Sequence, residues 1–291
     1  MMPSSALDWD TVQGYADAFL AQGIFALRNR PVAEPADVRA ATPGNYLFSL
    51  ADQPMYIGEG SNLGARLRQQ LNVRTSTFHK NYLKTEPADP APITAFTLQS
   101  MTTWLGRKEI EDFGIANIPT PLNRFQLDKR PVREAATSSE AWSRIQDARD
   151  DLLSQGEDRF RSSPQTPMLT AAVPPRPGLY ALRSGSPARV VYIGESSDLR
   201  ARHKTHCTQT YFSALRRNIG TGLLGFELRE MRGKRRYFTD DEDRRLTVFL
   251  GGCQYQYMEV AVGRLELEER LIRHETPKGN RKGIERESVQ V

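Results

Sequence analysis

Two pairs of segments recur in the same order along this chain, and this internal repeat constrains the fold more than any other feature. The segments at 43–66 and 177–202 share Pro-Gly-x-Tyr, a short gap, Tyr-Ile-Gly-Glu and a Leu-x-Ala-Arg ending. The segments at 105–123 and 262–280 share Gly-Arg-x-Glu-x-Glu, with an Ile four residues and an Asn twelve residues after the second Glu. Because two matched pairs in one order are improbable by chance, the sequence predicts a duplicated domain.

Each copy is predicted to open with a β-hairpin, because β-favouring apolar runs flank a cluster of turn-forming residues. Ser61 and Ser197 are predicted to cap the helices that follow. In the second of these helices, Leu199, Arg202 and His206 have the spacing i, i+3 and i+7, which places them on one face, toward the sheet. The expected strand, turn and strand lie at 45–50, 51–54 and 55–58 in the first copy and at 178–182, 184–187 and 190–194 in the second.

A further strand is predicted near the end of each copy, at 93–99 and at 256–262, and a helix at 265–273 follows the second of these strands. The repeated order β-β-α-β-α indicates an α/β (α+β) fold with a small central sheet in each copy.

The repeat also sets the expected domain boundaries. Residues 8–27 carry apolar residues at mixed helical spacing, 138–155 is polar and helical, and 156–177 is rich in Ser, Thr and Pro, as linkers are. The predicted parts are an N-terminal helical appendage at 1–41, a first domain at 42–127, a helix and linker at 128–173, and a second domain at 174–291.

The second copy is also predicted to hold a long insertion between Arg202 and Glu268. This insertion contains the basic clusters 215–218 and 232–237 and a predicted capped helix from Thr239 through Leu250. Residues 171–291 contain 22 Lys and Arg against 15 Asp and Glu, whereas residues 1–170 contain 18 against 20. The net charge of +5 therefore averages a basic C-terminal part and a slightly acidic N-terminal part, and the basic part hints at a polyanionic partner.

Length and composition exclude several other classes of protein. A chain of 291 residues with 38% hydrophobic and 26% charged residues has the composition of a globular protein with about two domains. No window approaches the roughly 18 apolar residues that a membrane helix needs, and the N-terminus lacks the pattern of a signal peptide, so we expect no membrane partner and a cytoplasmic location. Cys207 and Cys253 form no CxxC pair, which argues against a structural zinc or a disulfide framework.

The second copy carries side chains that suit phosphodiester hydrolysis. Tyr180 and Tyr192 lie at matching places on adjacent strands, Arg202 and His206 project from the following helix, and Glu268 from a later one. A carboxylate can hold a hydrated magnesium ion, an arginine can bind the phosphate, and a tyrosine or histidine can take a proton from the attacking water. Taken singly, each residue has an ordinary structural explanation, and it is their joint spacing, found twice, that favours function.

This pattern of Gly-x-Tyr, Tyr-Ile-Gly, an Arg eight residues later, a Glu, and an Asn twelve residues after the Glu resembles the GIY-YIG nuclease superfamily. The resemblance covers roughly 42–125 and 174–283. It implies that each copy is a three-stranded antiparallel sheet flanked by helices that hydrolyses DNA with one divalent metal ion, Mg²⁺ or Mn²⁺, per active domain.

Site roles follow from the resemblance position by position. Glu268 would bind the metal, Arg202 would contact the scissile phosphate, and Tyr180 and Tyr192 would position or deprotonate the water. His206 would be a general base or a phosphate contact, Asn280 would brace the site, and Gly178 and Gly194 would keep the hairpin close-packed. The matching residues of the first copy are Gly44, Tyr46, Tyr56, Gly58, Arg66, Gln70, Glu111 (the candidate metal ligand) and Asn123.

Two departures from the family pattern bear on activity. Gln70 stands where the second copy has His206, and because Gln cannot titrate, any proton transfer at that position is lost in the first copy. Glu59 and Glu195 follow Tyr-Ile-Gly where many family members have Lys, which removes a positive charge beside the metal. The second copy is therefore the better candidate for cleavage.

The expected function is a metal-dependent endonuclease acting on double-stranded or branched DNA, in restriction, defence or repair. Two alternatives stay open: a non-catalytic DNA-binding or scaffold protein built on degenerate domains, and cleavage of RNA. The cations expected to follow the phosphate backbone are Arg200, Lys204, Arg216, Arg217, Lys234, Arg235 and Arg236.

Overall fold

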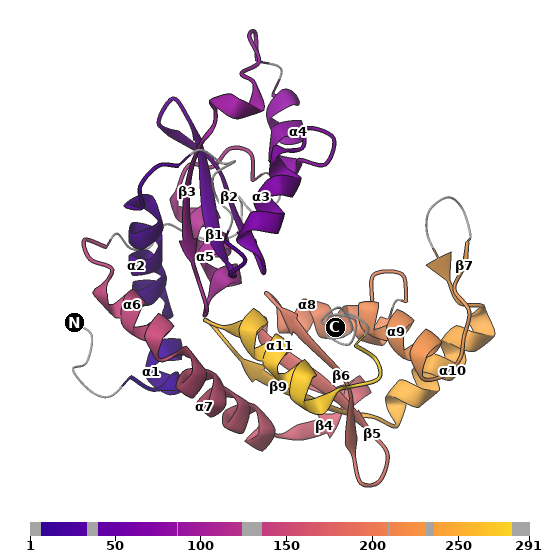
Figure 1. The fold of residues 1–291 in the computed structure, drawn as a ribbon. Coiled ribbons are helices and arrows are strands. Elements are labelled where there is room, and N and C mark those ends of the chain that lie inside the picture. Colours follow the sequence, from indigo (N-terminus) through magenta and orange to yellow (C-terminus); the bar gives the residue numbers. More distant parts are fainter. Residues whose placement is uncertain are drawn as a thin grey trace, which may run out of the picture. The chain divides into compact units, whose positions relative to one another are not determined.

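The computed structural model describes residues 7–33, 40–85, 87–123, 136–208, 210–230 and 236–280, without the side chains of Glu230 and Arg236. These residues form two compact units, which divide between Leu152 and Leu153 (Figure 1). Each unit is a small antiparallel sheet flanked by helices, so the predicted mixed α/β class is confirmed.

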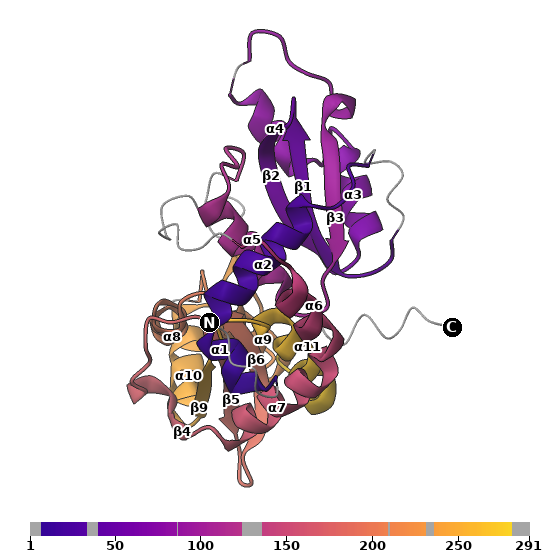
Figure 2. The same ribbon diagram turned by 90° about the vertical axis from the view of Figure 1, so that its left-hand side faces the viewer.

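The first unit has a three-stranded sheet in the order β2-β1-β3, and Figure 2 shows the strands side by side. Helix α2 and the pair α3 and α4 flank this sheet on opposite sides (Figure 1). The described elements are α1 (Trp9–Gly14), α2 (Ala16–Arg28), β1 (Gly44–Leu50), β2 (Gln53–Gly60), α3 (Leu63–Leu71), α4 (Thr77–Leu83), the 3₁₀ turn η2 (Ile93–Ala95), β3 (Thr97–Thr102), α5 (Arg107–Asn117) and α6 (Glu140–Asp147).

The second unit has a four-stranded sheet in the order β4-β9-β5-β6, so the expected three strands are wrong for this unit because β4 adds a strand beside β9. The described part of the insertion forms a two-stranded β7-β8 ribbon. Helix α7, which begins before the division of the chain, leads into the second unit. The described elements are α7 (Arg149–Ser162), β4 (Gln165–Pro167), the 3₁₀ turn η3 (Met168–Thr170), β5 (Gly178–Ser184), β6 (Arg189–Ser196), α8 (Leu199–Thr208), α9 (Ala214–Gly222), β7 (Arg229–Glu230), β8 (Arg236–Tyr237), α10 (Asp240–Gly251), β9 (Gln254–Glu259) and α11 (Arg264–Glu275).

The two central hairpins have the same register. Tyr46 lies opposite Gly58, and Tyr180 lies opposite Gly194. A register shift follows Phe48 in the first hairpin and Leu182 in the second, two residues after each tyrosine. The sequence repeat therefore corresponds to a repeated strand geometry.

A helix and a short extended segment precede the hairpin in both units. In the first unit α2 packs against α5, and Ala33 bridges to Leu98 of β3. In the second unit α7 is followed by β4, whose Thr166 pairs with Tyr255 of β9. The expected appendage is thus part of the first fold, because α2 buries an apolar face against it. The expected linker instead holds the end of a helix and a sheet strand.

Two glutamines that the repeat search did not detect hold these preceding helices to the sheets. Gln99 Nε2 donates to the carbonyl oxygens of Arg28 and Arg30, at 2.6 and 2.9 Å. Gln256 Nε2 donates to the carbonyl oxygen of Phe160 at 2.6 Å. Carbonyl groups at a helix end lack partners within the helix, so these two amides satisfy them from β3 in the first unit and β9 in the second.

The predicted helix caps are partly wrong. Asn62 caps α3 by accepting from Ala65 N at 2.9 Å, and Asp198 accepts from Ala201 N at the same distance, so both caps lie one residue after the predicted serines. Thr239 caps α10 with a complete capping box, as predicted. Among the described residues, no helix has both the length and the apolarity to span a bilayer.

Candidate active site

A close approach of ring to backbone explains why glycine ends each Tyr-Ile-Gly segment. A Cβ atom added to Gly194 would lie 2.4 Å from the Tyr180 hydroxyl oxygen, and one added to Gly58 would lie 2.4 Å from that of Tyr46. No real side chain tolerates such contacts, so glycine lets the tyrosine ring lie flat over the neighbouring strand. This agrees with the close packing expected of the hairpin.

The hairpin stacks two tyrosines in each unit. The rings of Tyr180 and Tyr192 have centroids 6.2 Å apart and an interplanar angle of 20°, and those of Tyr46 and Tyr56 are also 6.2 Å apart, at 29°. All four rings are buried. Burial is the main reason that the pKa of each phenol is raised, and it raises the pKa of Tyr192 to about 12. All four phenols are therefore protonated at neutral pH.

The predicted arginine and glutamate lie beside this tyrosine pair. After burial, the Glu268 carboxylate is the largest influence that raises the pKa of Tyr192, while the Tyr180 hydrogen bond and the Arg202 guanidinium lower it. Glu111 and Arg66 act in the same directions on Tyr56. The structure thus brings together side chains from two strands and two helices in each unit, as the sequence predicted.

His206 does not have the environment of a general base. Its side chain is fully buried, with Nε2 at 2.8 Å from the Tyr180 hydroxyl and Nδ1 at 2.7 Å from Ser213 Oγ. Burial, reinforced by Arg202, lowers the pKa of His206 to about 3. The predicted phosphate contact is wrong, because no part of this side chain reaches solvent.

The hydroxyl that contacts His206 also caps a helix. Ser213 Oγ accepts from Arg216 N at 2.9 Å at the start of α9, so the position of this hydroxyl beside His206 Nδ1 is fixed by the helix. His206 Nε2 contacts the Tyr180 hydroxyl in either tautomer, and Tyr180 in turn stacks on Tyr192. His206 is therefore a neutral bridge between Ser213 and the tyrosine pair.

Gln70 makes the same bridge in the first unit. Its Nε2 lies 3.3 Å from the Tyr46 hydroxyl, and its Oε1 lies 3.4 Å from Ser76 Oγ and accepts from Thr77 N at 3.1 Å. Because the backbone N–H of Thr77 fixes the amide orientation, Nε2 must be the donor to Tyr46. Ser76 and Ser213, both helix caps, were missed by the repeat search because they stand six and seven residues after Gln70 and His206.

Asn280 and Asn123 brace the sheet edge, as expected. Asn280 accepts from Ile193 N at 2.8 Å and donates to Ile193 O at 2.7 Å, and Asn123 makes the same two bonds to Ile57, at 2.9 and 2.8 Å. Each amide imitates a neighbouring strand, which fixes the backbone directly after the second tyrosine.

The acidic residue after Tyr-Ile-Gly has a structural partner in both units. Glu195 Oε2 lies 2.8 Å from Nε of Arg264, and Glu59 Oε2 lies 4.0 Å from Nη1 of Arg107. Both arginines are only 1–2% exposed, and a buried guanidinium needs a countercharge. The glutamate that stands where many family members have Lys is therefore the countercharge of the buried Arg in the Gly-Arg-x-Glu motif.

The two candidate metal ligands differ in their surroundings. In the first unit, Lys108 Nζ lies 2.5 Å from Glu111 Oε2 and 3.6 Å from Asp112 Oδ1, whereas the second unit has Leu265 at the position of Lys108. Glu268 in the second unit is half-buried, and a magnesium ion that keeps most of its waters needs only one such carboxylate. The first site does not fit it, because an ammonium group already contacts the carboxylate. Over the described ranges, no cluster of three or more His, Cys, Asp or Glu suits a metal ion.

The predicted DNA-binding cations fall into three groups. Arg200 and Lys204 are exposed on α8, the helix that carries Arg202, and Arg217 is half-buried and acts on the pKa of Tyr192. Arg216 is 1% exposed and bound by Asp243 at 3.0 Å, so its predicted contact with nucleic acid is wrong. Lys234, Arg235 and the Arg236 side chain lie outside the described residues.

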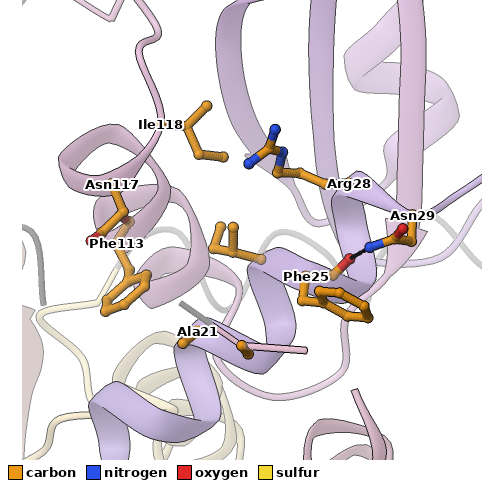
Figure 3. A pocket seen from close by; sticks show the side chains of 9 residues that line it. Ala21, Phe25, Arg28, Asn29, Phe113, Asn117 and Ile118 are labelled. Carbon is orange, nitrogen blue, oxygen red and sulfur yellow. Dashed lines mark hydrogen bonds between the residues drawn. The ribbon is translucent and has the colours of Figure 1, made fainter. Parts of the chain in front are cut away.

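A separate cavity of about 340 Å³ lies between α2 and α5 of the first unit (Figure 3). Ala21, Phe25 and Phe113 give it an apolar wall, and Arg28 and Asn117 a polar one. None of the predicted site residues lines it.

Comparison of the chain with models of known families, with curated proteins and with solved structures finds no match.

Proposed function

We propose that the two units are copies of one GIY-YIG-like domain and that the protein is a metal-dependent DNA endonuclease whose second unit cleaves. The observation that carries this proposal is the cluster of Tyr180, Tyr192, Arg202 and Glu268, in which two oriented phenols lie within the electrostatic reach of one cation and one anion. The same arrangement in the first unit supports a common origin.

The residues of this cluster have separable tasks. Arg202 binds a phosphate oxygen and offsets the charge that develops on it during hydrolysis. Tyr180, held by His206, stacks on Tyr192, so that the tyrosine pair keeps one arrangement in which the Tyr192 hydroxyl can orient a water molecule. Glu268 would hold Mg²⁺ or Mn²⁺, which supplies positive charge to the phosphate and the water when bound. Both phenols are protonated at neutral pH, so they act first by hydrogen bonding.

The exposed cations of α8 support DNA as the substrate. Arg200 and Lys204 stand on the helix that also carries Arg202, where they can contact phosphates next to the scissile one. The C-terminal charge excess acts in the same direction. The free thiols Cys207 and Cys253 fit a reducing compartment such as the cytoplasm.

Cleavage assays on the full chain test the proposal. Supercoiled plasmid, branched duplex, single-stranded DNA and matched RNA are incubated with Mg²⁺ or Mn²⁺. We expect DNA cleavage that Glu268→Gln abolishes and that the matched variant Glu111→Gln leaves within about twofold. Absence of cleavage of every substrate by the unaltered protein would refute the enzymatic claim, and preferential cleavage of RNA would reassign the substrate.

The Lys108–Glu111 contact favours a second candidate, a non-catalytic DNA-binding or scaffold protein, because it shows one site without an open metal ligand. A scaffold of this kind binds DNA equally well with and without a divalent metal. An endonuclease of the proposed kind would show a rise in thermal unfolding temperature with Mn²⁺ that Glu268→Ala removes, and a scaffold would show no such rise. Absence of this rise in the unaltered chain contradicts the endonuclease proposal, whereas metal-independent DNA binding alone does not.

A further inference from the structure

An exposed phenylalanine lies close to the tyrosine pair of the second unit. Phe212 stands in the turn between α8 and α9, and 58% of this residue is exposed. The next residue, Ser213, caps α9 and contacts His206 Nδ1 at 2.7 Å, and His206 Nε2 contacts the Tyr180 hydroxyl at 2.8 Å. The turn that carries the phenylalanine is therefore tied to the proposed site through two hydrogen bonds.

Two further aromatic rings support Phe212. Its ring meets that of Tyr211 edge to face, with centroids 4.3 Å apart at 82°, and Tyr211 stacks on Tyr237 of β8 at 5.5 Å and 20°. Single apolar side chains are common on protein surfaces, whereas these three rings in contact form an ordered aromatic platform. Tyr211 and Tyr237 are half-buried, so Phe212 is the most exposed ring of the platform.

A cation links the aromatic platform to the tyrosine pair. Arg217 of α9 donates from Nη1 to the carbonyl oxygens of Thr210 and Tyr211, at 3.2 and 2.5 Å, which fixes the turn that precedes Phe212. Helix α9 also packs against β6, the strand that carries Tyr192. The charge of Arg217 reaches that phenol and lowers its pKa against the effect of burial. A positive charge therefore stands near both the platform and the site.

We propose that Phe212 stacks on an unpaired nucleobase next to the scissile phosphate. The second unit then prefers DNA with an unpaired nucleotide, at a branch or a bulge, over continuous duplex. Every base has a flat π-face, so stacking on an aromatic side chain binds it whatever its identity. In continuous duplex the neighbouring base pairs cover these faces, and only an unpaired or extruded base reaches the ring. Arg217 binds a phosphate beside the stacked nucleotide. The inference rests on the proposed function for DNA as the partner and for the position of the cleaved bond.

The matching turn of the first unit has a different side chain before its cap. Thr75 directly precedes the cap Ser76, and its hydroxyl donates to the carbonyl oxygen of Gln69 at 2.8 Å. A threonine offers no ring on which a base can stack. Phe212 thus belongs to the unit that is proposed to cleave.

Binding of the full chain to labelled DNA, followed by fluorescence anisotropy in EDTA, tests this inference without cleavage. Three short duplexes of one sequence are compared: a continuous duplex, one with a single-nucleotide bulge, and one with an abasic residue in the same bulge. The abasic residue keeps the phosphates and loses only the base. We expect the unaltered chain to bind the bulged duplex about tenfold more tightly than either of the other two.

Substitution of the ring identifies the residue responsible. Phe212→Ala should bind the bulged and the abasic duplex equally, whereas Phe212→Trp, which keeps a ring, should retain the preference. Val248→Ala removes another exposed apolar side chain of the second unit and should behave like the unaltered chain. Circular dichroism and thermal unfolding check that each variant is folded. Equal binding of the bulged and abasic duplexes by the unaltered chain overturns the inference, and so does a folded Phe212→Ala variant that keeps the preference.

These measurements also separate the inference from the proposed function. If the base preference depends on Phe212 but no substrate is cleaved with Mg²⁺ or Mn²⁺, the ring has the role assigned to it and the endonuclease proposal fails. If DNA is cleaved but binding shows no base preference, the endonuclease proposal stands and the inference fails. A chain that binds none of the three duplexes contradicts the inference as well.

Discussion

Replacing His206 by Gln should make the second unit less sensitive to acid while preserving its fold. The first unit already uses Gln70 for the same bridge, with one nitrogen toward a tyrosine hydroxyl and one oxygen toward a cap serine. The substitution therefore keeps a polar partner for Tyr180 and another for Ser213, and removes only the group that can take up a proton.

The size of the effect follows from the lowered pKa. His206 has a pKa of about 3 in the folded chain against the ordinary value of 6.5, so the unfolded chain binds a proton between these values and the folded chain does not. Stability from this residue is thus complete above pH 6.5 and is lost as the pH falls toward 3. Between pH 8 and pH 5 the linkage relation gives a loss of about 2 kcal/mol in the free energy of unfolding.

Urea unfolding at pH 8 and pH 5 measures this difference. Far-UV circular dichroism follows both units, and tryptophan fluorescence follows the first unit, because Trp9, Trp104 and Trp142 all lie there. The unaltered chain should lose about 2 kcal/mol more than His206→Gln between the two pH values, in the transition that fluorescence does not report. Gln70→His is the matched reciprocal variant and should introduce a similar acid sensitivity into the fluorescence transition. Equal losses in the unaltered chain and in His206→Gln would refute the assignment of a buried neutral histidine.

Three further substitutions test the site scaffold. Gly194→Ala places a Cβ 2.4 Å from the Tyr180 hydroxyl, so we expect a loss of about 1–3 kcal/mol in urea unfolding and loss of cleavage; unchanged stability would contradict the close approach of the ring to the strand. Asn280→Ala leaves the Ile193 N–H and C=O without their amide partner and should cost about 2–3 kcal/mol in the same assay, whereas a cost below about 0.5 kcal/mol would show that water replaces it. Burial would raise the pKa of Glu157, but hydrogen bonds from His274, Arg161 and Arg270 lower it to about 2. The stabilisation that Glu157 provides is therefore lost as the pH falls from about 4.5 to 2. Glu157→Gln should reduce the fall of the thermal unfolding temperature over this pH range, and an unchanged fall would contradict the prediction.

The sequence was sufficient for the parts of the structure where a residue type is forced by contact geometry. Gly58 and Gly194 must be glycine because a tyrosine hydroxyl occupies the space of a Cβ, and Asn123 and Asn280 must offer both a donor and an acceptor to one backbone unit. Such positions keep their identity in both copies, so a search for repeats finds them.

The sequence did not show the parts that depend on packing alone. Helices α2 and α7 share no motif, since a helix that covers a sheet needs only an apolar face of the right length. The adjacent Arg216 and Arg217 look alike in the sequence, yet α9 turns the first inward to Asp243 and leaves the second half-buried. Only the contacts that each side chain makes in the folded unit show whether a cation is structural or is available to a ligand.

The charge beside Glu111 is visible in the sequence, although the repeat pattern does not draw attention to it. Lys108 and Glu111 stand at i and i+3 in a predictable helix. Their ion pair gives the second Glu of the Gly-Arg-x-Glu-x-Glu motif a cationic partner in the first unit. Gln70 is not the chemical defect that its residue type suggests, because it performs the same bridging task as His206.

The comparison of the two units separates what the tyrosine pair requires from what a metal requires. The bridge to a cap serine, the buried Arg–Glu pair and the asparagine brace all occur twice, although His206 and Gln70 differ in chemistry. These elements therefore serve the placement of the phenols, and a fold that keeps them in both units is under the same packing constraints in each. The charge of the residue three positions before the glutamate is not part of this framework, because Lys108 and Leu265 differ in charge while the bridge, the Arg–Glu pair and the brace occur in both units.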